Sequence, residues 1–423
     1  MKHVIVIPDG GADLPLPELD GLTPFQAADT PVLDKIAREG RVGTAATTPE
    51  GFGAGSDVCT MDLLGYDPAR YHTGRAPLEA AALGLMPPPP ATIFRLNLVT
   101  VGEDSDDAGQ MLDHSAGAIT DSEARVLLKD LLAHWQRSQP DLAATLSLTP
   151  GESYRSVLID TAELGYDAVE TTPPHEIPGL PWANHLPAGA KPAAEKLTAL
   201  IESSAEVLTD HEVNWARRDA DLRPANLAWI WGQGTTPQLP SFESRFGLRG
   251  AMLTSVDLLR GIARLIGWDV LDCPGLTSYH DTDYDAQARA TIEALSDYDL
   301  VVCHVEAPDE ASHQADFETK VASLEAIDSR ILTPLVAHLE STYGDPEVND
   351  EDEGWRLLVL PDHYTLCSTR KHDPTPVPFA IRGAWMRSVV ERPFTEAAAN
   401  ESDLHIDPGH DLMEYFLRSG LRG

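Results

Sequence analysis

The chain has 423 residues, of which 42% are hydrophobic. This length exceeds what one hydrophobic core usually serves, so it predicts two domains or one large domain with an insertion. Its 67 acidic residues against 31 basic ones give a formal net charge of -36, and a field of that sign repels nucleic-acid backbones and anionic lipid. Because no apolar run approaches the roughly 20 residues of a membrane helix and the apolar opening is too short for a signal peptide, we expect a cytoplasmic protein with neither nucleic acid nor membrane as partner.

The N-terminal segments predict the start of an α/β domain. "HVIVIP", residues 3–8, has the composition of a short buried strand. "TPVLDKIAREG" has a helix signature, with Thr30 at the N-cap, Pro31 at the first helical position and Gly40 at the end. A strand followed by a polar loop and a helix is typical of the opening of such a domain.

The same alternation of helices and strands returns late in the chain. Three segments have the spacing of apolar residues that predicts a helix, and each is followed by an apolar run that predicts a strand. Residues 255–267 precede "WDVLDC", and residues 290–298 precede "DLVVCHVE". Residues of about 317–339 precede "WRLLVLPDH", with an acidic loop at 345–354 between them. "VPFAIRG" predicts a further strand, and "GHDLMEYFLRSG" predicts a closing helix. Uniformly apolar strands separated by helices indicate a parallel sheet with both faces covered.

The segment between these two stretches does not show this regular alternation of apolar strands and helices. A Pro-rich spacer, "LMPPPPATIF", and an acidic loop, "GEDSDDAGQ", are followed by expected strands in "SYRSVLID" and "YDAVETT" and by a long helix over about 190–218. We therefore expect a smaller α+β domain, residues 97–185, inserted into a main domain made of residues 1–96 and 186–423.

Polar side chains stand where the expected strands end, which is where open parallel sheets bind their ligands. These residues are Asp9, Asp309, His313, Asp362, His363 and His372. Each has an ordinary alternative; Asp9, for instance, is a common turn residue. Together they are the oxygen and nitrogen ligands that suit Mn²⁺, Zn²⁺ or Mg²⁺, and so they predict a metal site.

Ser56 is the candidate nucleophile. It follows the glycine-rich run "GFGAG" and opens the apolar helix "VCTMDLLG". A serine at a helix N-terminus is most often an N-cap, but the same position offers backbone N–H groups to a phosphate. Beside a metal, its hydroxyl can ionise without an adjacent histidine base.

These motifs carry a family resemblance. "PDG", "GSD", "DEASH", "PDH" and "HDPTPVPF" occur in the order found in the alkaline phosphatase superfamily. The chain more closely resembles the archaeal type of cofactor-independent phosphoglycerate mutase, with "LDGLTPFQAADTPVLDKIAREG", "HSAGAIT" and "GHDLMEYFL" among the similar segments. The resemblance implies an alkaline-phosphatase-like α/β fold, with a mostly parallel sheet, helices on both faces and an inserted α+β domain.

The resemblance also implies two divalent metal ions and their ligands. Mn²⁺ is favoured over Zn²⁺ and Mg²⁺, and no 2,3-bisphosphoglycerate is expected. Asp9, Ser56, Asp362 and His363 would hold one ion, and Asp309, His313 and His372 the other. Ser56 would take the phosphoryl group of 3-phosphoglycerate and return it to the 2-hydroxyl. The inserted domain, with one hinge near 96–101 and a second near its return to the main domain, would exclude water.

Contacts to the small phosphorylated substrate are expected from a set of cations and polar residues: Arg75, Arg95, Asn97, His114, Arg155, His175 and Glu306. Glu306 and "DHSAG" stand where the better-known archaeal mutases tend to have a lysine and an Arg-rich segment. This variant pattern resembles a branch with a proposed homoserine kinase role, in which Glu306 would pair with an ammonium group. A metal-dependent phosphatase and a metal-stabilised binding protein without turnover are the remaining alternatives, and the sequence leaves the oligomeric state open.

Overall fold

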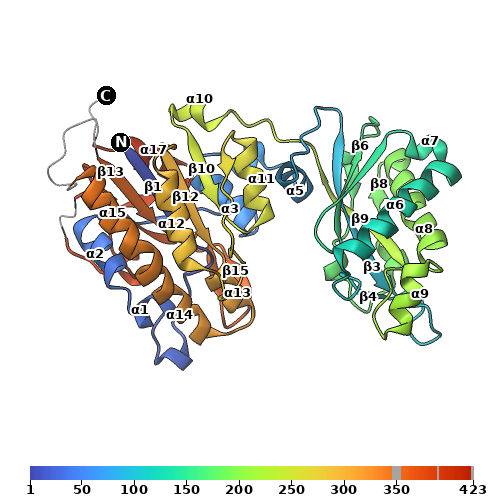
Figure 1. Cartoon of the computed structure of the whole chain (residues 1–423), viewed down its shortest axis with the longest axis horizontal. Coiled ribbons are helices and arrows are strands. Elements are labelled where there is room, and N and C mark those ends of the chain that lie inside the picture. The colour runs from blue at the N-terminus through green and yellow to red at the C-terminus, as the bar shows by residue number, and fades with distance from the viewer. Residues whose placement is uncertain (345–353, 388–389, 421–423) are drawn as a thin grey trace. The chain divides into compact units, whose positions relative to one another are not determined.

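The computed structural model describes residues 1–344, 354–387 and 390–420, so most of the acidic loop expected at 345–354 lies outside the described residues. The chain forms two compact units. Unit 1 consists of Met1–His72 with Gln238–Gly423, and unit 2 of Thr73–Pro237. Figure 1 shows the course of the chain through the elements of each unit.

Unit 1 is built on an eight-stranded sheet of order β11-β10-β12-β1-β13-β16-β2-β17. Its strands are β1 (Lys2–Pro8), β2 (Arg41–Ala45), β10 (Gly250–Leu253), β11 (Asp269–Val270), β12 (Leu300–Val305), β13 (Trp355–Val359), β16 (Val377–Gly383) and β17 (His405–Ile406). Neighbouring strands run parallel except at β16, which is antiparallel to both β13 and β2. A two-stranded hairpin of β14 (Tyr364–Leu366) and β15 (Lys371–Asp373) follows β13.

Helices cover both faces of this sheet. The longer ones are α2 (Pro31–Glu39), α3 (Ser56–Leu63), α11 (Asp257–Leu265), α12 (Tyr284–Ala294), α13 (Ala307–His313), α14 (Phe317–Ala326), α15 (Thr333–Tyr343) and α17 (Asp411–Arg418), and the shorter ones are α1 (Pro24–Ala27), α4 (Pro68–Tyr71), α10 (Phe242–Phe246) and α16 (Glu396–Asn400). α2 and α12 pack on the segment between α14 and α15, whereas α11 and α17 pack on α3 (Figure 1). The expected mostly parallel sheet with helices on both faces is therefore confirmed.

Burial explains why the central strands are apolar throughout. Every residue of β12, β13 and β16 is buried, because helices cover both sides of the sheet. The helix expected at 317–339 is α14 and α15 joined by a π-helical segment, Ile327–Leu332. Pro334, the second residue after this segment, has no N–H to donate in the regular helical pattern.

Unit 2 is a smaller α+β unit with an antiparallel sheet. β3 (Thr92–Val101) is its central strand and pairs with β4 (Met111–Asp113), β6 (Arg155–Asp160) and β9 (Leu227–Gly234), while β5 (Leu146–Pro150) pairs with β6 and β7 (Val169–Glu170) with β8 (Ala188–Gly189). The helices are α5 (Arg75–Ala82), α6 (Asp121–Ser138), α7 (Pro140–Ala143), α8 (Lys191–Leu208) and α9 (Glu212–Asp219).

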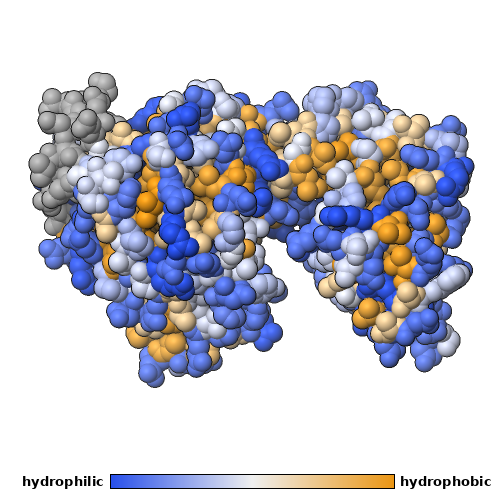
Figure 2. All heavy atoms as spheres, viewed as in Figure 1, coloured by the Kyte–Doolittle hydropathy of each residue, from blue (hydrophilic) through white to orange (hydrophobic). Residues whose placement is uncertain are grey.

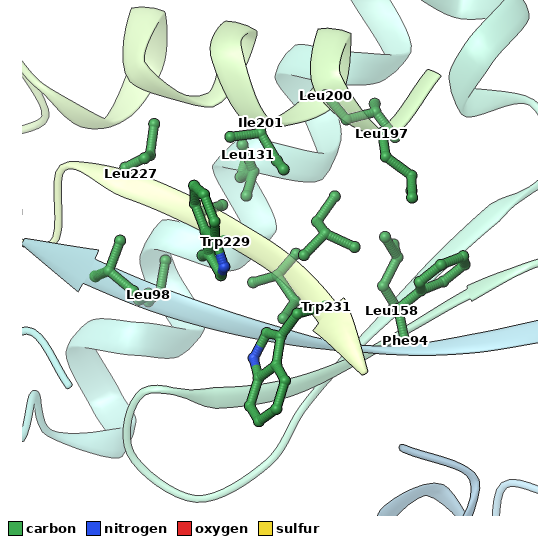
Figure 3. Packing of buried hydrophobic residues seen from close by; sticks show 14 of the residues in the cluster. Phe94, Leu98, Leu131, Leu158, Leu197, Leu200, Ile201, Leu227, Trp229 and Trp231 are labelled. Atoms are coloured by element: carbon green, nitrogen blue, oxygen red, sulfur yellow. The ribbon is translucent and has the colours of Figure 1, made fainter. Parts of the chain in front are cut away.

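Alternating residues of the strands of unit 2 face two different cores. Phe94 and Leu158 belong to a core with leucines of α6 and α8 and with the fully buried Trp135 and Trp229 (Figure 3). Their strand neighbours Ile93, Val157 and Ile159 instead pack on alanines of α5. This period of two is what a sheet covered on both faces requires.

The boundaries of unit 2 are wider than the expected 97–185. Its central strand β3 starts at Thr92, and its partner β9 is supplied by residues 227–234. The expected hinge at 96–101 lies inside β3 between two hydrogen-bonded neighbours, so it is wrong. The long helix expected at 190–218 is two helices, because the His211 side chain caps a new helix by accepting a hydrogen bond from Val213 N. Of the strand expected in "YDAVETT", Val169–Glu170 is a strand, β7, whereas Tyr166–Ala168 forms a 3-10 turn.

The surface is rich in hydrophilic residues, as expected from the many acidic residues in the sequence (Figure 2). On the face shown in Figure 2, hydrophilic residues predominate and apolar ones lie between them. Within the described ranges, no helix has both the length and the apolar character needed to cross a membrane.

Candidate metal centre

Three adjacent strands of unit 1 end at candidate ligands. β12, β1 and β13 lie side by side and run parallel, so their carboxyl ends meet at one edge of the sheet. Asp9 follows β1, and Asp362 and His363 follow β13. Helix α13, which follows β12, carries Asp309 and His313 one turn apart. The parallel topology therefore brings together residues that are far apart in the chain.

The first ligand group consists of Asp309, His313 and His372. His372 is supplied by β15, whose hairpin folds back toward α13. The Nε2 atoms of the two histidines lie 3.0 Å apart. Asp309 Oδ2 is 3.1 Å from His313 Nε2, and Asp309 Oδ1 is 3.4 Å from His372 Nε2. These atoms converge on one point, as the ligands of a single ion do.

Backbone carbonyls orient both imidazoles of this group. His313 Nδ1 lies 3.0 Å from the carbonyl of Arg370, and His372 Nδ1 lies 3.1 Å from that of Ala54. Because a carbonyl only accepts, each Nδ1 carries a proton, and in the neutral ring each Nε2 then presents a lone pair. Two lone pairs facing each other at 3.0 Å repel unless a cation or a proton lies between them. This is the donor arrangement of a metal site.

The second ligand group contains Asp9, Asp362 and His363, which are fully buried. His363 Nε2 lies 3.5 Å from Asp9 Oδ1 and 3.4 Å from Asp362 Oδ2. Asp362 Oδ1 accepts hydrogen bonds from the backbone N–H groups of Gly10 and His363. Asp9 Oδ1 and Asp362 Oδ2 have no hydrogen-bond partner among the described residues. Buried carboxylate oxygens without donors are costly, and a divalent cation satisfies both.

Ser56 belongs to this second group. Gly55 occupies the N-cap position of α3, with an extended backbone at φ 177, and Ser56 is the first helical residue. The Ser56 hydroxyl lies 3.3 Å from Asp9 Oδ2 and 3.3 Å from His363 Nε2. Its side chain thus faces the ligands instead of capping the helix.

Electrostatic coupling ties the ligands together. Burial, reinforced by the charge of Asp9, raises the pKa of Asp362 to about 7. Burial also opposes ionisation of Asp309, but hydrogen bonds from His313 and His372 outweigh it and hold the pKa of Asp309 well below its usual range. The same pairing raises the pKa of His313 to about 9. Such crowding of carboxylates in a buried site is what a divalent cation relieves.

The residues present fit two divalent ions. Candidate ligand atoms within 4.8 Å of one another form three overlapping groups: Asp309, His313 and His372; Asp9, Asp309 and His363; and Asp9, His304 and Asp362. The structure therefore brings together the seven residues expected as ligands. Carboxylate, hydroxyl and imidazole ligands suit Mn²⁺, Zn²⁺ and Mg²⁺ alike.

His304 is a member of this constellation that the sequence analysis missed. It lies in β12, is fully buried, and its Nε2 is 2.9 Å from Asp9 Oδ2. Its Nδ1 is 3.2 Å from the hydroxyl of Thr254. The available signal was a histidine within the otherwise apolar run "LVVCHV", since a polar residue buried in a central strand needs a partner.

Six of the seven expected substrate residues gather in unit 2. The Arg95 guanidinium is 2.8 Å from Glu79 Oε1 and lies 4.2 Å from the Trp231 ring centroid. Trp231 Nε1 donates to Asn97 Oδ1 at 3.1 Å, and Asn97 in turn donates to the carbonyl of His114 at 3.3 Å. Trp231 and Glu79 were not predicted from the sequence, because Trp231 reaches Arg95 through the pairing of β3 with β9 and Glu79 through the packing of α5 on β3.

The remaining three residues border the same cluster. The His175 ring lies 5.5 Å from the Trp231 ring and 6.1 Å from the His114 ring, measured between centroids. Burial lowers the pKa of Arg95; pairing with Glu79 opposes this, and the charges of Arg75 and Arg155 lower it further. The cluster is thus a concentration of positive charge in a strongly acidic protein.

Glu306, the seventh expected substrate residue, lies in unit 1 instead. Its Oε2 is 3.9 Å from His304 Nε2 and has no hydrogen-bond partner among the described residues. Burial, with the nearby charge of Asp9, raises the pKa of Glu306 well above its usual value. Within unit 1, Glu306 therefore lies beside the candidate metal ligands.

Comparisons with known proteins cover the whole chain. The family model for 2,3-bisphosphoglycerate-independent phosphoglycerate mutase matches residues 37–214. A protein of that name from Methanothrix thermoacetophila is 41% identical over 417 residues, covering 99% of this chain and 100% of the relative. Another from Methanosarcina acetivorans is 43% identical over 381 residues, covering 90% of each chain.

Solved structures give the same picture of the fold. The PH0037 protein from Pyrococcus horikoshii has a TM-score of 0.79 at 27% identity and covers 98% of this chain and 96% of its own. A cofactor-independent phosphoglycerate mutase from Thermoplasma acidophilum has a TM-score of 0.65 at 24% identity, covering 99% of each chain; this likeness concerns the fold alone.

The mostly parallel sheet, with candidate metal ligands where its strands end, defines a metal-site α/β protein of the fold seen in cofactor-independent phosphoglycerate mutases. The full-length relatives then decide the family. The chain belongs to the 2,3-bisphosphoglycerate-independent phosphoglycerate mutases, and the resemblance inferred from the motifs is confirmed.

Proposed function

We propose that the protein interconverts 3-phosphoglycerate and 2-phosphoglycerate, with Ser56 carrying the phosphoryl group between the two positions. The observation that carries this proposal is the place of the Ser56 hydroxyl, 3.3 Å from both Asp9 and His363 in the buried ligand group. The family of the chain supports the choice of substrate.

The proposed reaction balances without any further reactant. The Ser56 oxygen forms a bond to phosphorus while the bond from phosphorus to the 3-oxygen of glycerate breaks, and the proton of Ser56 ends on that oxygen. The 2-hydroxyl of the same glycerate then attacks phosphorus, the bond to Ser56 breaks, and the proton returns to Ser56. Because both steps exchange one P–O bond for another, no 2,3-bisphosphoglycerate is required.

Two divalent cations, Mn²⁺ by preference, would favour ionisation of a coordinated hydroxyl and neutralise phosphate charge. Asp9, Ser56, Asp362 and His363 would hold one of them, and Asp309, His313 and His372 the other. Among the residues of this chain, Asp9 and His363 orient the Ser56 oxygen, and His304 holds Asp9 through its Nε2.

The cationic cluster of unit 2 is the proposed binding site for the anionic groups of the substrate. Arg75, Arg95 and Arg155 supply planar guanidinium groups that pair with phosphate and carboxylate in bidentate fashion. Asn97, His114 and His175 add further hydrogen-bonding groups. The proposed partner is thus a small phosphorylated acid, in keeping with the cytoplasmic location expected from the sequence.

The decisive experiment is a coupled assay of 3-phosphoglycerate conversion. Metal-stripped protein reloaded with Mn²⁺ is assayed without added 2,3-bisphosphoglycerate, beside the Ser56→Ala variant. We expect turnover in the wild type that requires both the metal and Ser56. Folded, metal-loaded protein without turnover would contradict the proposal.

A homoserine phosphotransferase is the second candidate, favoured by Oε2 of Glu306, which lies beside the ligand group and has no hydrogen-bond partner within the described ranges. A carboxylate at that position can pair with the ammonium group of an amino acid. Activity on homoserine with a phosphoryl donor, lost in Glu306→Gln, together with no conversion of 3-phosphoglycerate, would select this candidate over the mutase.

A further inference from the structure

Thr365 lies where the two ligand groups meet. It is the middle residue of β14 and is fully buried. Its hydroxyl is 2.5 Å from Oδ1 of Asp309, in the first group, and 3.1 Å from Nδ1 of His363, in the second. Directly opposite Thr365 in the hairpin stands His372, the third ligand of the first group. One side chain is therefore in contact with ligands of both groups.

The chemistry of a hydroxyl determines the direction of these two hydrogen bonds. An ionised carboxylate only accepts, so Thr365 donates its single proton to Asp309. Toward His363 the hydroxyl must then accept, which requires the proton of the neutral imidazole to sit on Nδ1. That tautomer leaves the lone pair on Nε2, the atom that faces Ser56, Asp9 and Asp362.

The backbone of Thr365 is held as firmly as its side chain. The carbonyl of Thr365 accepts a hydrogen bond from Nζ of the buried Lys320 at 2.7 Å, and its N–H donates to the carbonyl of Ala12 at 3.3 Å. Lys320 is itself paired with Asp13 at 3.0 Å. The main chain of Thr365 therefore cannot move away from the ligands without breaking buried contacts.

The space around this hydroxyl is filled. At Gly10, whose φ is +58, a Cβ atom would meet the Thr365 hydroxyl and Asp309 Oδ1 at less than any observed contact distance. A glycine is thus required for the chain after Asp9 to pass the Thr365–Asp309 hydrogen bond. The backbone at Gly10 therefore lies directly against the Thr365 hydroxyl and Asp309 Oδ1.

We propose that Thr365 is a positioning residue that couples the two ligand groups, orienting Asp309 in one and fixing the tautomer of His363 in the other. The inference rests on the metal centre of the proposed function and extends it to a residue outside the ligand set. It predicts that losing one hydroxyl weakens metal binding in both groups at once.

The test measures metal binding without substrate. Co²⁺ is titrated into metal-stripped wild type, Thr365→Val, Thr365→Ala and Thr365→Ser by calorimetry and by visible absorption, which reports ligand geometry. We expect Thr365→Val and Thr365→Ala to weaken both binding events roughly 10- to 100-fold, the usual effect of losing a partner that orients a ligand. Thr365→Ser, which keeps the hydroxyl, should retain wild-type binding.

Two controls separate positioning from a general loss of packing. Thr291→Val makes the same change at a fully buried threonine of α12 whose hydroxyl donates to the Gln287 carbonyl and contacts no candidate ligand, so Co²⁺ binding should not change. His313→Ala removes a ligand of the first group alone and shows the titration pattern of one damaged site. If Thr365→Val does not fold, Thr365→Ala against Thr365→Ser isolates the hydroxyl.

The outcomes are distinct. Unchanged Co²⁺ affinity in folded Thr365→Val and Thr365→Ala, or a loss confined to one binding event as in His313→Ala, overturns the inference. A wild type that binds no Co²⁺ overturns it together with the metal centre. Two Co²⁺ ions bound with the expected loss in Thr365→Val, but no conversion of 3-phosphoglycerate, upholds the inference and rejects only the proposed reaction.

Discussion

At the residue scale, the hydrogen bonds that a side chain makes to its neighbours determine which of its atoms can bind a ligand. His313 and His372 donate Nδ1–H to backbone carbonyls, so each presents Nε2 toward Asp309. Arg95 is held in the same way in unit 2, by Glu79 on one side and the Trp231 ring on another. In both units the partner of a functional group limits its orientation, which is how a folded protein prepares a site before a ligand arrives.

Arg95 allows a prediction at this scale. If its guanidinium binds an anionic group of the substrate, Arg95→Lys should raise KM for 3-phosphoglycerate with a smaller effect on kcat. Loss of a charge-assisted hydrogen bond costs about 1.5–3 kcal/mol, or roughly 10- to 100-fold in KM. Steady-state kinetics with Mn²⁺-loaded protein provide the measurement.

The matched control is Arg218→Ala. Arg218 also lies in unit 2, but it pairs with Glu103 at the surface. Its removal should leave KM within about twofold, since an exposed pair contributes only about 0–1 kcal/mol. Equal effects of Arg95→Lys and Arg218→Ala would mean that Arg95 is not a substrate contact.

Elements of unit 1 are joined by buried polar contacts behind the metal centre. Lys320 of α14 is fully buried and bonds Asp13, after β1, and the carbonyl of Thr365 in β14. Asp13 Oδ2 also accepts from the backbone N–H of Cys367. A single ion pair thus ties a helix, the loop after the first strand and the hairpin into one structure.

Removing one partner of this buried ion pair should cause a large loss of stability. Lys320→Met leaves the buried Asp13 without its partner, and we expect the free energy of unfolding to fall by about 3–5 kcal/mol. Urea denaturation of the metal-free protein measures the change. The double variant Lys320→Met with Asp13→Leu should recover part of the loss, because it removes the uncompensated charge.

A surface pair serves as the control for this experiment. Lys35 and Glu340 are 3.2 Å apart, with side chains 44% and 35% exposed. Lys35→Met should change the free energy of unfolding by no more than about 1 kcal/mol. A cost for Lys320→Met as small as that for Lys35→Met would contradict the structural role assigned to Lys320.

The buried His3, at the second position of β1, should make the free energy of unfolding depend on pH. It is buried and its ring lies 5.5 Å from that of Phe416 in α17, edge to face. Burial, with the charge of Arg356, lowers the pKa of His3 from 6.5 to about 3. The unfolded chain therefore binds the proton first, so the contribution of His3 is complete above pH 6.5 and is lost as the pH falls from 6.5 toward 3.

The variant His3→Leu isolates this contribution. Each pH unit below 6.5 should cost the wild type about 1.4 kcal/mol relative to His3→Leu. Urea denaturation of both proteins at pH 7 and pH 5.5 gives the difference in slope. Parallel pH dependence of the two proteins would show that His3 is not the titrating group.

At the scale of the whole molecule, the dominant feature is charge. A formal net charge of -36 produces self-repulsion that opposes the compact state, while the proposed anion-binding cluster must attract a substrate of the same sign. Local cations with fixed orientation, such as Arg95, resolve this conflict because they act at short range.

Added salt should therefore stabilise the protein. Raising NaCl from about 0.1 M to about 1 M shortens the screening length from about 10 Å to about 3 Å and weakens repulsion among surface carboxylates. We expect the midpoint of thermal unfolding to rise over this range, as measured by circular dichroism. A midpoint that is constant or falls with salt would show that surface repulsion does not limit stability.

Local sequence patterns were sufficient to predict much of the fold and the candidate metal ligands. α2 begins at Pro31 and ends before Gly40 because these residues act on the backbone at their own positions. β1, β12 and β13 are recognisable as apolar runs, and Asp9 and Asp362 are recognisable as polar residues directly after them. Such features depend only on near neighbours in the chain.

What the sequence by itself determined was the kind of fold, the family and the residues at the strand ends, because strand periodicity, caps and motifs are short-range. Only the tertiary structure decided the limits of unit 2, the break between α8 and α9, and the contacts of His304, Thr365 and Trp231. Thr365 meets Asp309 across 56 positions and Trp231 meets Asn97 across 134, through sheet and hairpin pairings that no local pattern specifies. Long-range register is a property of the packed molecule, and at this site it determines which atoms face one another.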